Sequence, residues 1–333
     1  MTTIAPQIRP RGLGRIVFFL VSTALIAAAA TTAPSCLARA SARPPLVYTI
    51  TYTAHAGDRR EATVLLPAGY EPDSSSPLPL VISPHGRGAN GRSNSKFWGN
   101  LPTVGRFAVV NPDGMGRRLK SFSYGFAGQI DDLARMPDIV EQELPWVRID
   151  RSRIYALGSS MGGQETLLLV ARHPHLLAGA AAMDSVTDLA LRYDQALEIP
   201  TSAEFVKRWG APNSVCLRRA MVREVGGTPS ANPRAYAVRS PLSQARAIAE
   251  SGVPLQIWWS RADKIVMHQN TQSGALYRQL RRIGTRAPLE AYVGNWKHST
   301  EMRADALLPV AVSGFGLLPG GVDRSPAGVD HSV

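Results

Sequence analysis

The stretch of sequence that decides the fold is "RIYALGSSMGGQETLLLVARHP", from Arg153 to Pro174. It opens with an apolar run over 153–158, which predicts a buried strand. A turn rich in glycine and serine follows, and the pattern from 164 to 173 is that of a helix. Such a tight junction between strand and helix is either a plain corner or the place where a nucleophile, Ser160, is presented.

Two glycines favour the nucleophile. In a nucleophile elbow the serine takes a strained backbone conformation, so the residues two before and two after it must be small. Gly158 and Gly162 meet this requirement, and the start of the following helix offers N–H groups and the positive end of its dipole. Ser159 fits poorly, because its corresponding neighbours are a leucine and a methionine. We therefore predict that Ser160 is the nucleophile.

Strands and helices are predicted to alternate along the rest of the chain. This alternation is typical of the α/β class, with a mostly parallel central sheet and helices on both faces. Ligands of such sheets bind beyond the carboxyl ends of the strands. The predicted strands are 46–54, 61–67, 77–84, 105–114, 153–158, 176–184, 254–260 and 287–294, and the predicted helices are 131–147, 164–173, 241–252, 268–284 and 299–312.

A serine hydroxyl needs a base and the base needs an acid, and both follow predicted strands. His298, in "GNWKHST", comes directly after the last predicted strand and is the predicted base. Asp263, in "IWWSRADKIV", follows the strand at 254–260 and is the favoured acid that would orient the imidazole. Asp184, after the strand core at 177–183, is its rival. Either acid gives the chain order Ser, Asp, His.

An oxyanion hole needs two backbone N–H donors. One is expected from Met161, directly after the nucleophile. The other is expected from Arg87 in the loop "HGRG" that follows the strand at 77–84, where Gly86 lets the backbone approach closely. His85 is predicted to orient this loop rather than to catalyse.

At these residues the chain resembles the α/β-hydrolase superfamily. "GSSMGG" and "SPHGRGAN" are similar to the elbow and the oxyanion loop of single-domain secreted esterases. The segment 226–284, with its Gly-Gly turn, "RSP" and "RADKIV", resembles the catalytic domain of prolyl-oligopeptidase-like serine hydrolases. The resemblance covers roughly 60–312 and implies the α/β-hydrolase fold and serine hydrolase chemistry. The chain departs from the family in having Trp259-Ser260 where His-Gly often precedes the acid.

The first 40 residues have the composition of a secretory signal peptide. Three arginines precede the apolar run Ile16–Ala30, and small residues follow in "ARA" and "ASA". We expect cleavage and export. A retained membrane anchor is disfavoured because a spanning helix needs about 20 apolar residues. A lipid-modified Cys36 is disfavoured because "APSC" lacks the usual aliphatic residue.

Composition limits the partners. The formal charge of +12 falls to +8 when the four arginines of the signal leave; we interpret this charge as one that keeps the exported chain in solution, and attraction to anionic cell surfaces is the alternative. No basic run is interleaved with aromatic residues, so nucleic-acid binding is not expected. No Cys/His cluster has metal-ligand spacing, and no metal or cofactor is expected. Cys216 would be the one cysteine left, and it is predicted to be buried.

Three regions and three functions are predicted. A hydrolase domain is expected over 41–312, with an irregular insertion at 185–240 that has short helices and covers the site, and a flexible tail over 313–333. The favoured function is a secreted hydrolase that cleaves small or polymeric carboxylic esters through an acyl-enzyme. A serine peptidase with the same residues is the first alternative, disfavoured because nothing in the chain matches the propeller that gates oligopeptidases. A non-catalytic binding protein is the second.

Overall fold

An eight-stranded sheet runs through the described residues in the order β1-β2-β4-β3-β5-β6-β7-β8. The structure, a computed structural model, describes residues 43–72, 76–115, 121–209, 214–320 and 328–331. Strands β1 and β2 form an antiparallel hairpin, β2 pairs antiparallel with β4, and all further pairs are parallel. The mostly parallel sheet is thus confirmed. The strands are β1 (Leu46–Thr53), β2 (Arg59–Leu66), β3 (Leu78–Ile82), β4 (Ala108–Pro112), β5 (Ile149–Ser159), β6 (Gly179–Met183), β7 (Leu255–Ser260) and β8 (Leu289–Gly294).

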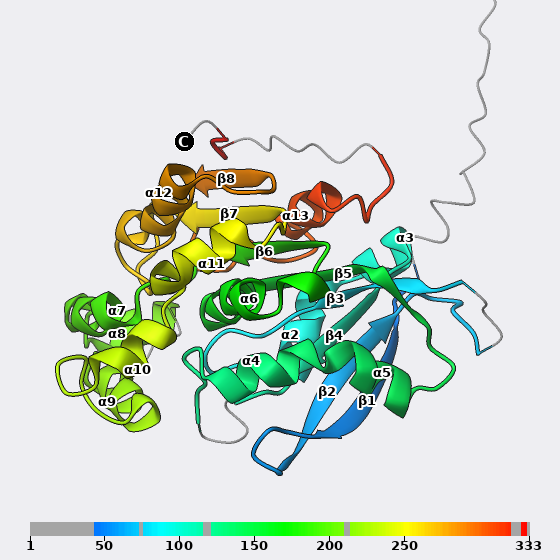
Figure 1. Ribbon diagram of the computed structural model, residues 1–333, viewed down its shortest axis with the longest axis horizontal. Helices are drawn as coiled ribbons and strands as arrows, with labels where there is room; N and C mark the ends of the chain where they lie inside the picture. Colours follow the sequence, from blue (N-terminus) through cyan, green and yellow to red (C-terminus); the bar gives the residue numbers. More distant parts are fainter. Residues whose placement is uncertain (1–42, 73–75, 116–120, 210–213, 321–327, 332–333) are drawn as a thin grey trace, which may run out of the picture. The chain divides into compact units, whose positions relative to one another are not determined.

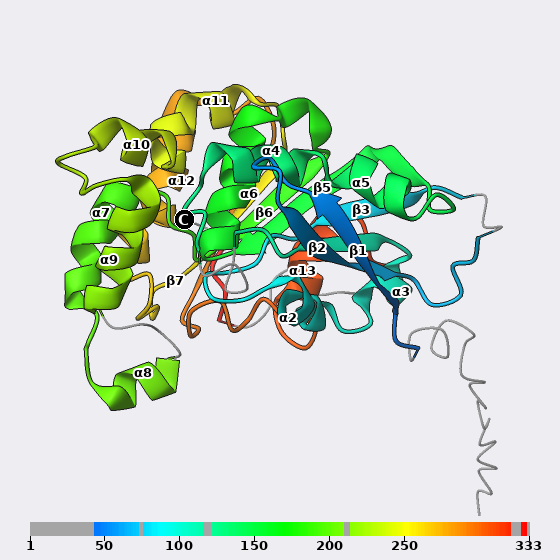
Figure 2. The ribbon, with the colours of Figure 1, turned by 90° about the horizontal axis from the view of Figure 1, so that it is seen from below.

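Two hydrophobic clusters, one on each face, bury this sheet. Alternate side chains of β3 show the division, because Leu80 and Ile82 pack into one cluster and Val81 into the other. Figures 1 and 2 show helices on both faces, as the sequence predicts. One face carries α4 (Ala127–Ala134), α5 (Met136–Glu143), α6 (Met161–Arg172), α11 (Ala245–Glu250) and α12 (Ser273–Ile283), and the other carries α2 (Gly91–Ser95), α3 (Leu101–Gly105) and α13 (Leu308–Gly314).

The insertion at 185–240 has short helices, as the sequence predicts, but they pack around a cluster of their own and are not irregular. Four helices lie at one end of the sheet, with α8 (Ala203–Trp209) apart from the other three (Figure 2), and the insertion forms most of a third hydrophobic cluster, which includes Leu189, Met221 and Tyr236. The cluster also takes in Tyr124 and Val266 from outside the insertion, and these tie the helices to the domain. The four are α7 (Leu189–Gln195), α8 (Ala203–Trp209), α9 (Ser214–Val225) and α10 (Pro233–Val238).

Two predicted helices differ from the observed ones. The helix predicted over 131–147 is broken at Arg135 into α4 and α5, because Pro137 in the first turn of α5 lacks an N–H and cannot continue a helix from α4. The helix predicted over 299–312 is helical only from Leu308, since Ser299 has a φ of +52° and its N–H bonds to Asp184.

Two further expectations are corrected. The tail is not loose in its described part, because Leu317 is buried and the backbone of Asp330 makes a two-bond bridge to Val293 of β8. Cys216 is exposed, because the buried stripe of α9 passes through Leu217 and Met221 and leaves position 216 outside it.

The predicted signal peptide lies outside the described residues. Within the described ranges, none of the helices combines the length and apolarity needed to span a membrane.

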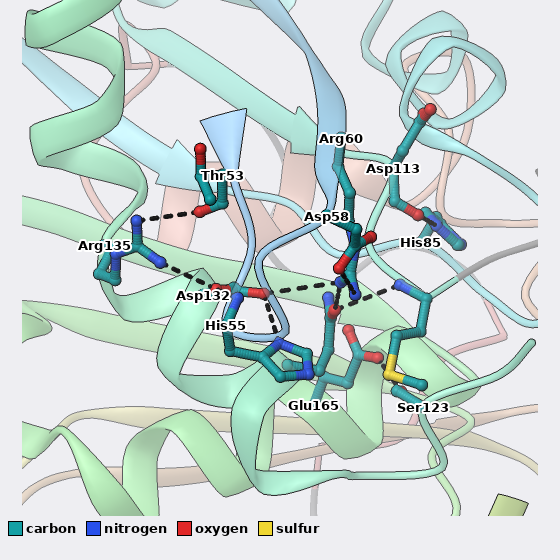
Figure 3. Close-up of polar contacts among 12 residues, drawn as sticks. Thr53, His55, Asp58, Arg60, His85, Asp113, Ser123, Asp132, Arg135 and Glu165 are labelled. Atoms are coloured by element: carbon teal, nitrogen blue, oxygen red, sulfur yellow. Dashed lines mark hydrogen bonds and ion pairs between the residues drawn. The ribbon is translucent and has the colours of Figure 1, made fainter. Parts of the chain in front are cut away.

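A buried carboxylate ties the first hairpin to α4 (Figure 3). The side chain of Asp132 is 1% exposed and accepts hydrogen bonds from the N–H and the ring Nδ1 of His55, at 2.9 Å and 2.7 Å. Arg60 and Arg135 approach the same carboxylate at 3.5 Å and 3.0 Å. Since His55 lies in the hairpin turn and Arg60 in β2, one side chain of α4 fixes the position of the outer strands.

We expect Asp132→Ala to lower the free energy of unfolding by about 3 kcal/mol, because it removes the acceptor of His55 and leaves the buried guanidinium of Arg60 with only the 40% exposed Asp58 as its counter-charge. The matched control is Asp138→Ala, which breaks a pair with Arg151 in which the aspartate is 73% exposed. Such an exposed pair contributes about 0.5 kcal/mol or less. Urea unfolding measures both variants, and equal midpoints for the two would contradict the prediction.

Candidate active site

Ser160 lies between β5 and α6 with a φ of +58° and a ψ of −122°. A positive φ is strained for a residue with a side chain, and such strain persists only where the surroundings impose it. Here the N–H of Ser160 donates to the carbonyl of Met183 in β6 at 2.9 Å, which fixes the turn to the sheet. The sharp junction predicted from the sequence is therefore present.

Two positions of the turn have no room for a side chain and therefore require glycine. A Cβ added to Gly158 would lie 2.5 Å from the backbone oxygen of Gly162, and one added to Gly162 would lie 2.2 Å from the backbone oxygen of Pro84. Both distances are far inside van der Waals contact, and both neighbours are backbone atoms that cannot rotate away. The small residues at these positions let β5, α6 and the loop after β3 meet behind Ser160.

His298 and Asp263 are in direct contact. Nδ1 of His298 lies 2.7 Å from Oδ2 of Asp263. The other oxygen of Asp263 accepts from the N–H groups of Ile265 and Val266, and Gln269 donates to Oδ2 at 3.3 Å. Because Nδ1 donates to the carboxylate, the neutral imidazole carries no proton on Nε2. Nε2 is thus the atom that can accept a proton.

The pKa of His298 is raised above its ordinary value of 6.5. Burial is the largest influence and lowers this pKa, but the charge of Asp263, its hydrogen bond and the charge of Asp184 together outweigh the burial. A neighbouring carboxylate stabilises the charged imidazolium more than the neutral imidazole, which raises the pKa. Asp263 therefore makes His298 a stronger base than an exposed histidine.

This shift predicts the acid limb of the pH profile. A protonated His298 cannot take a proton from Ser160, so activity is expected to disappear as pH falls through the raised pKa. We expect kcat/KM for an uncharged ester to rise with a midpoint above 6.5. Initial rates at subsaturating substrate across the pH range measure it. A midpoint at or below that value would contradict the assigned ion pair.

Asp184, the rival acid, contacts the loop that carries His298 rather than its ring. It is fully buried at the end of β6 and accepts from the N–H of Ser260 at 2.8 Å, from Trp296 Nε1 at 2.9 Å and from the N–H of Ser299 at 2.8 Å. Burial, and next the charge of Asp263, raise its pKa to about 6. Asp184, Asp263 and His298 each have one atom that could bind a metal ion, and these three atoms lie within 4.8 Å of one another. Both carboxylates, however, already accept hydrogen bonds from donors of the protein.

The loop after β3 lies beside the nucleophile. A Cβ on Gly86 would lie 3.6 Å from Cβ of Ser160, so the backbone passes close to it. His85 is 4% exposed, and its two ring nitrogens lie 2.8 Å from the carbonyl of Gly86 and 2.6 Å from that of Asp113. It contacts the loop and not the nucleophile. Met161 is the first residue of α6, where a backbone N–H has no acceptor within the helix.

A cavity of about 770 Å³ brings these parts together. Ser160, Met161, His298, Gly86 and Arg87 all line it. Asp263 lies behind His298. The insertion, which the sequence predicts to cover the site, forms a further part of the cavity wall. Its lining residues could not be predicted from the sequence and are Val186, Arg192, Ile199, Val206 and Leu217.

Trp258 and Trp259 do not belong to the site. They are 0% and 1% exposed, and they point to opposite faces of the sheet. Trp258 stacks on Tyr292 at a ring distance of 3.7 Å, and Trp259 donates to Asn270. Both are therefore core residues.

The parallel sheet, the strained serine and the buried His–Asp pair define a serine hydrolase of the α/β-hydrolase fold. The chain belongs to the prolyl oligopeptidase family, whose model matches residues 107–304, more than half of the chain. No curated protein sequence matches it significantly.

Solved structures show the same fold at low identity. Acylaminoacyl peptidase of Pyrococcus horikoshii is 14% identical with a TM-score of 0.58, over 79% of this chain and 39% of that one. A puromycin hydrolase is 18% identical with a TM-score of 0.60, over 86% and 42%. FphF, a fluorophosphonate-binding serine hydrolase of Staphylococcus aureus, is 18% identical with a TM-score of 0.56, over 82% and 99%. The chain thus spans about two fifths of the two larger enzymes.

Proposed function

We propose that the chain hydrolyses carboxylic esters through an acyl-enzyme formed on Ser160. One observation carries the proposal: His298, with Nδ1 bonded to Asp263, lines the same cavity as the strained Ser160. A hydroxyl, a base and an orienting acid at one cavity are the components of nucleophilic acyl transfer.

The steps follow from these atoms. Nε2 of His298 takes the proton of Ser160, whose Oγ forms a bond to the ester carbonyl carbon. The carbonyl oxygen becomes an oxyanion, which the N–H groups of Met161 and Arg87 stabilise. The C–O bond to the alcohol then breaks, and the imidazolium gives its proton to the departing oxygen. Water, deprotonated by His298, attacks the acyl-enzyme, the bond between the acyl carbon and Oγ breaks, and the imidazolium returns its proton to Oγ, which releases the acid and restores Ser160.

Peptide bonds are the second candidate, favoured by the family match. The same steps cleave an amide when the imidazolium protonates the departing nitrogen. Esters come first because an alcohol leaves more readily than an amine, so they place the smaller demand on the site.

A matched substrate pair separates the candidates. Para-nitrophenyl butyrate and butyryl para-nitroanilide share an acyl group and differ only in the bond that breaks. We expect faster turnover of the ester by the purified chain and covalent labelling of Ser160 by a fluorophosphonate. Turnover of peptide anilides with negligible ester turnover would assign a peptidase. An unlabelled Ser160 without any turnover would leave a binding protein and overturn the proposal.

We also propose that the chain is exported and then cleaved after the apolar segment. The basic, apolar and small-residue order of its first 40 residues supports this. Expression with the native N-terminus, followed by mass determination of the protein in the medium, tests it. A full-length intracellular product would contradict it.

A further inference from the structure

The cavity above Ser160 has a strongly positive lining. Arg87, Arg192 and Arg303 line it together with His298, and no Asp or Glu is found among its described lining residues. Focused charge of one sign in a cleft with apolar walls attracts ligands of the opposite sign. The remaining wall is largely apolar: Phe97, Phe122, Val186, Ile199, Val206 and Leu217.

Arg192 is the most buried of the three arginines. It projects from α7, is 4% exposed, and its Nη1 has no hydrogen-bond acceptor among the described residues. Burial, the largest influence, lowers its pKa to about 10. The carboxylate whose charge raises the pKa of Arg192, Asp263, is engaged by His298, Gln269 and two backbone N–H groups. A buried guanidinium with an unused donor is unfavourable unless a ligand supplies an acceptor.

Arg87 lies near Arg192 and is held in place by aromatic residues. Its Nε donates to the hydroxyl of Tyr124 at 2.8 Å, and its guanidinium lies 4.1 Å above the ring centre of Phe122. Its charge also lowers the pKa of Arg192, so the two guanidinium groups act on one region. Two fixed cations with planar donor sets suit a carboxylate, which accepts paired N–H bonds.

We propose that this cavity selects substrates that carry a carboxylate, which binds Arg192 with Arg87 beside it, while the chain between carboxylate and scissile bond lies against the apolar wall. The substrate class is thus an anionic ester or amide of an amphipathic acid or alcohol. This inference rests on the proposed hydrolase function. A neutral ester offers Arg192 an uncharged carbonyl acceptor but no negative charge and no matched pair of acceptors, so neutral esters are expected to bind less well.

Charge-matched substrate pairs test the proposal. Mono-para-nitrophenyl adipate carries a carboxylate on the acyl side, and its methyl ester is the neutral partner. Hexanoyl para-hydroxybenzoate carries the carboxylate on the leaving side, and its methyl ester is again neutral. We expect the wild-type chain to prefer the anionic member of at least one pair by about 30-fold or more in kcat/KM. The pair that shows this preference tells whether the carboxylate binds on the acyl side or on the leaving-group side of the scissile bond.

Arg192→Met is expected to abolish this preference, lowering kcat/KM for the anionic member by about 30-fold or more and leaving the neutral member within about threefold. The matched control is Arg218→Met in the neighbouring α9. Arg218 stacks on Tyr193 at 4.0 Å and also has a buried donor without an acceptor, but it lies outside the lining of the cavity. We expect it to keep the preference.

Two results would overturn the inference: equal kcat/KM for both members of both pairs in the wild type, or an equal loss on both members in Arg192→Met. If Arg192→Met does not fold, inhibition of the wild type by adipate, and not by dimethyl adipate, still decides the matter. Failure of the hydrolase proposal has a different signature, because no ester would then turn over. Calorimetric binding of adipate to the full chain would in that case still measure the carboxylate site.

Discussion

Ser160→Ala is expected to lower kcat for para-nitrophenyl butyrate by about 10⁴-fold or more, because no other hydroxyl can form the acyl-enzyme at this position. The alanine keeps the Cβ and removes only the hydroxyl, so the turn at φ +58° and the hydrogen bond from the N–H of residue 160 to Met183 are expected to remain. Stopped assays at matched protein concentration measure the loss, and unchanged urea unfolding shows that it is not a folding defect.

Ser159→Ala is the matched control for this prediction. Ser159 is the last residue of β5, one position before the elbow, and the sequence gives it poorly suited neighbours for a nucleophile. We expect it to keep activity within about tenfold and to keep fluorophosphonate labelling. A labelled Ser160→Ala variant, or an inactive and unlabelled Ser159→Ala variant, would assign the nucleophile to the neighbouring serine.

Asp263→Asn is expected to lower kcat by about 10³- to 10⁴-fold. The amide NH₂ cannot accept from Nδ1 of His298, so the imidazole is left in the wrong tautomer, with its proton on Nε2. The change also removes the charge that raises the pKa of His298, while the burial that lowers it remains. The acid limb of the residual activity is therefore expected at a lower pH than in the wild type.

Asp184→Asn distinguishes the two carboxylates. It disturbs the N–H donors of Trp296 and Ser299 on either side of His298 but does not contact the ring. We expect a loss of about tenfold to 100-fold in kcat, with the acid limb shifted less than in Asp263→Asn, because Asp184 is only a weaker contributor to the raised pKa of His298. A larger loss in Asp184→Asn than in Asp263→Asn would exchange the roles of the two.

The sheet and the elbow could be predicted because their signals are local. Buried strands such as 78–82 are continuous apolar runs, and Gly158 and Gly162 mark a turn whose neighbours are backbone atoms. The placement of Asp263 and His298 followed from one topological rule, since carboxyl ends of parallel strands share a rim. The contact between Nδ1 and the carboxylate was then a consequence of the fold.

The remaining features depend on partners that are distant in the chain. The helices of the insertion close over a cluster that includes Tyr124 and Val266, which no window of local sequence reveals. Ser299, at which a helix is predicted to begin, donates its N–H to Asp184, 115 positions away, and the observed helix begins only at Leu308. No sequence motif surrounds Arg192, and its proposed role in binding a carboxylate follows only from its burial and its place in the cavity wall. Such features are tertiary properties, and hydrophobic periodicity does not contain them.

The bridge between Val293 and Asp330 has a consequence for the outer border of the sheet. Strand β8 is last in the strand order, and a border strand with unpaired N–H and C=O groups is a template for pairing with other molecules. The segment that contains Asp330 caps part of that border through its two backbone bonds, and Arg261 approaches its carboxylate at 3.5 Å. Shortened versions that end before residue 328 would uncover β8 and favour intermolecular association, so preparations of the enzyme should retain this segment.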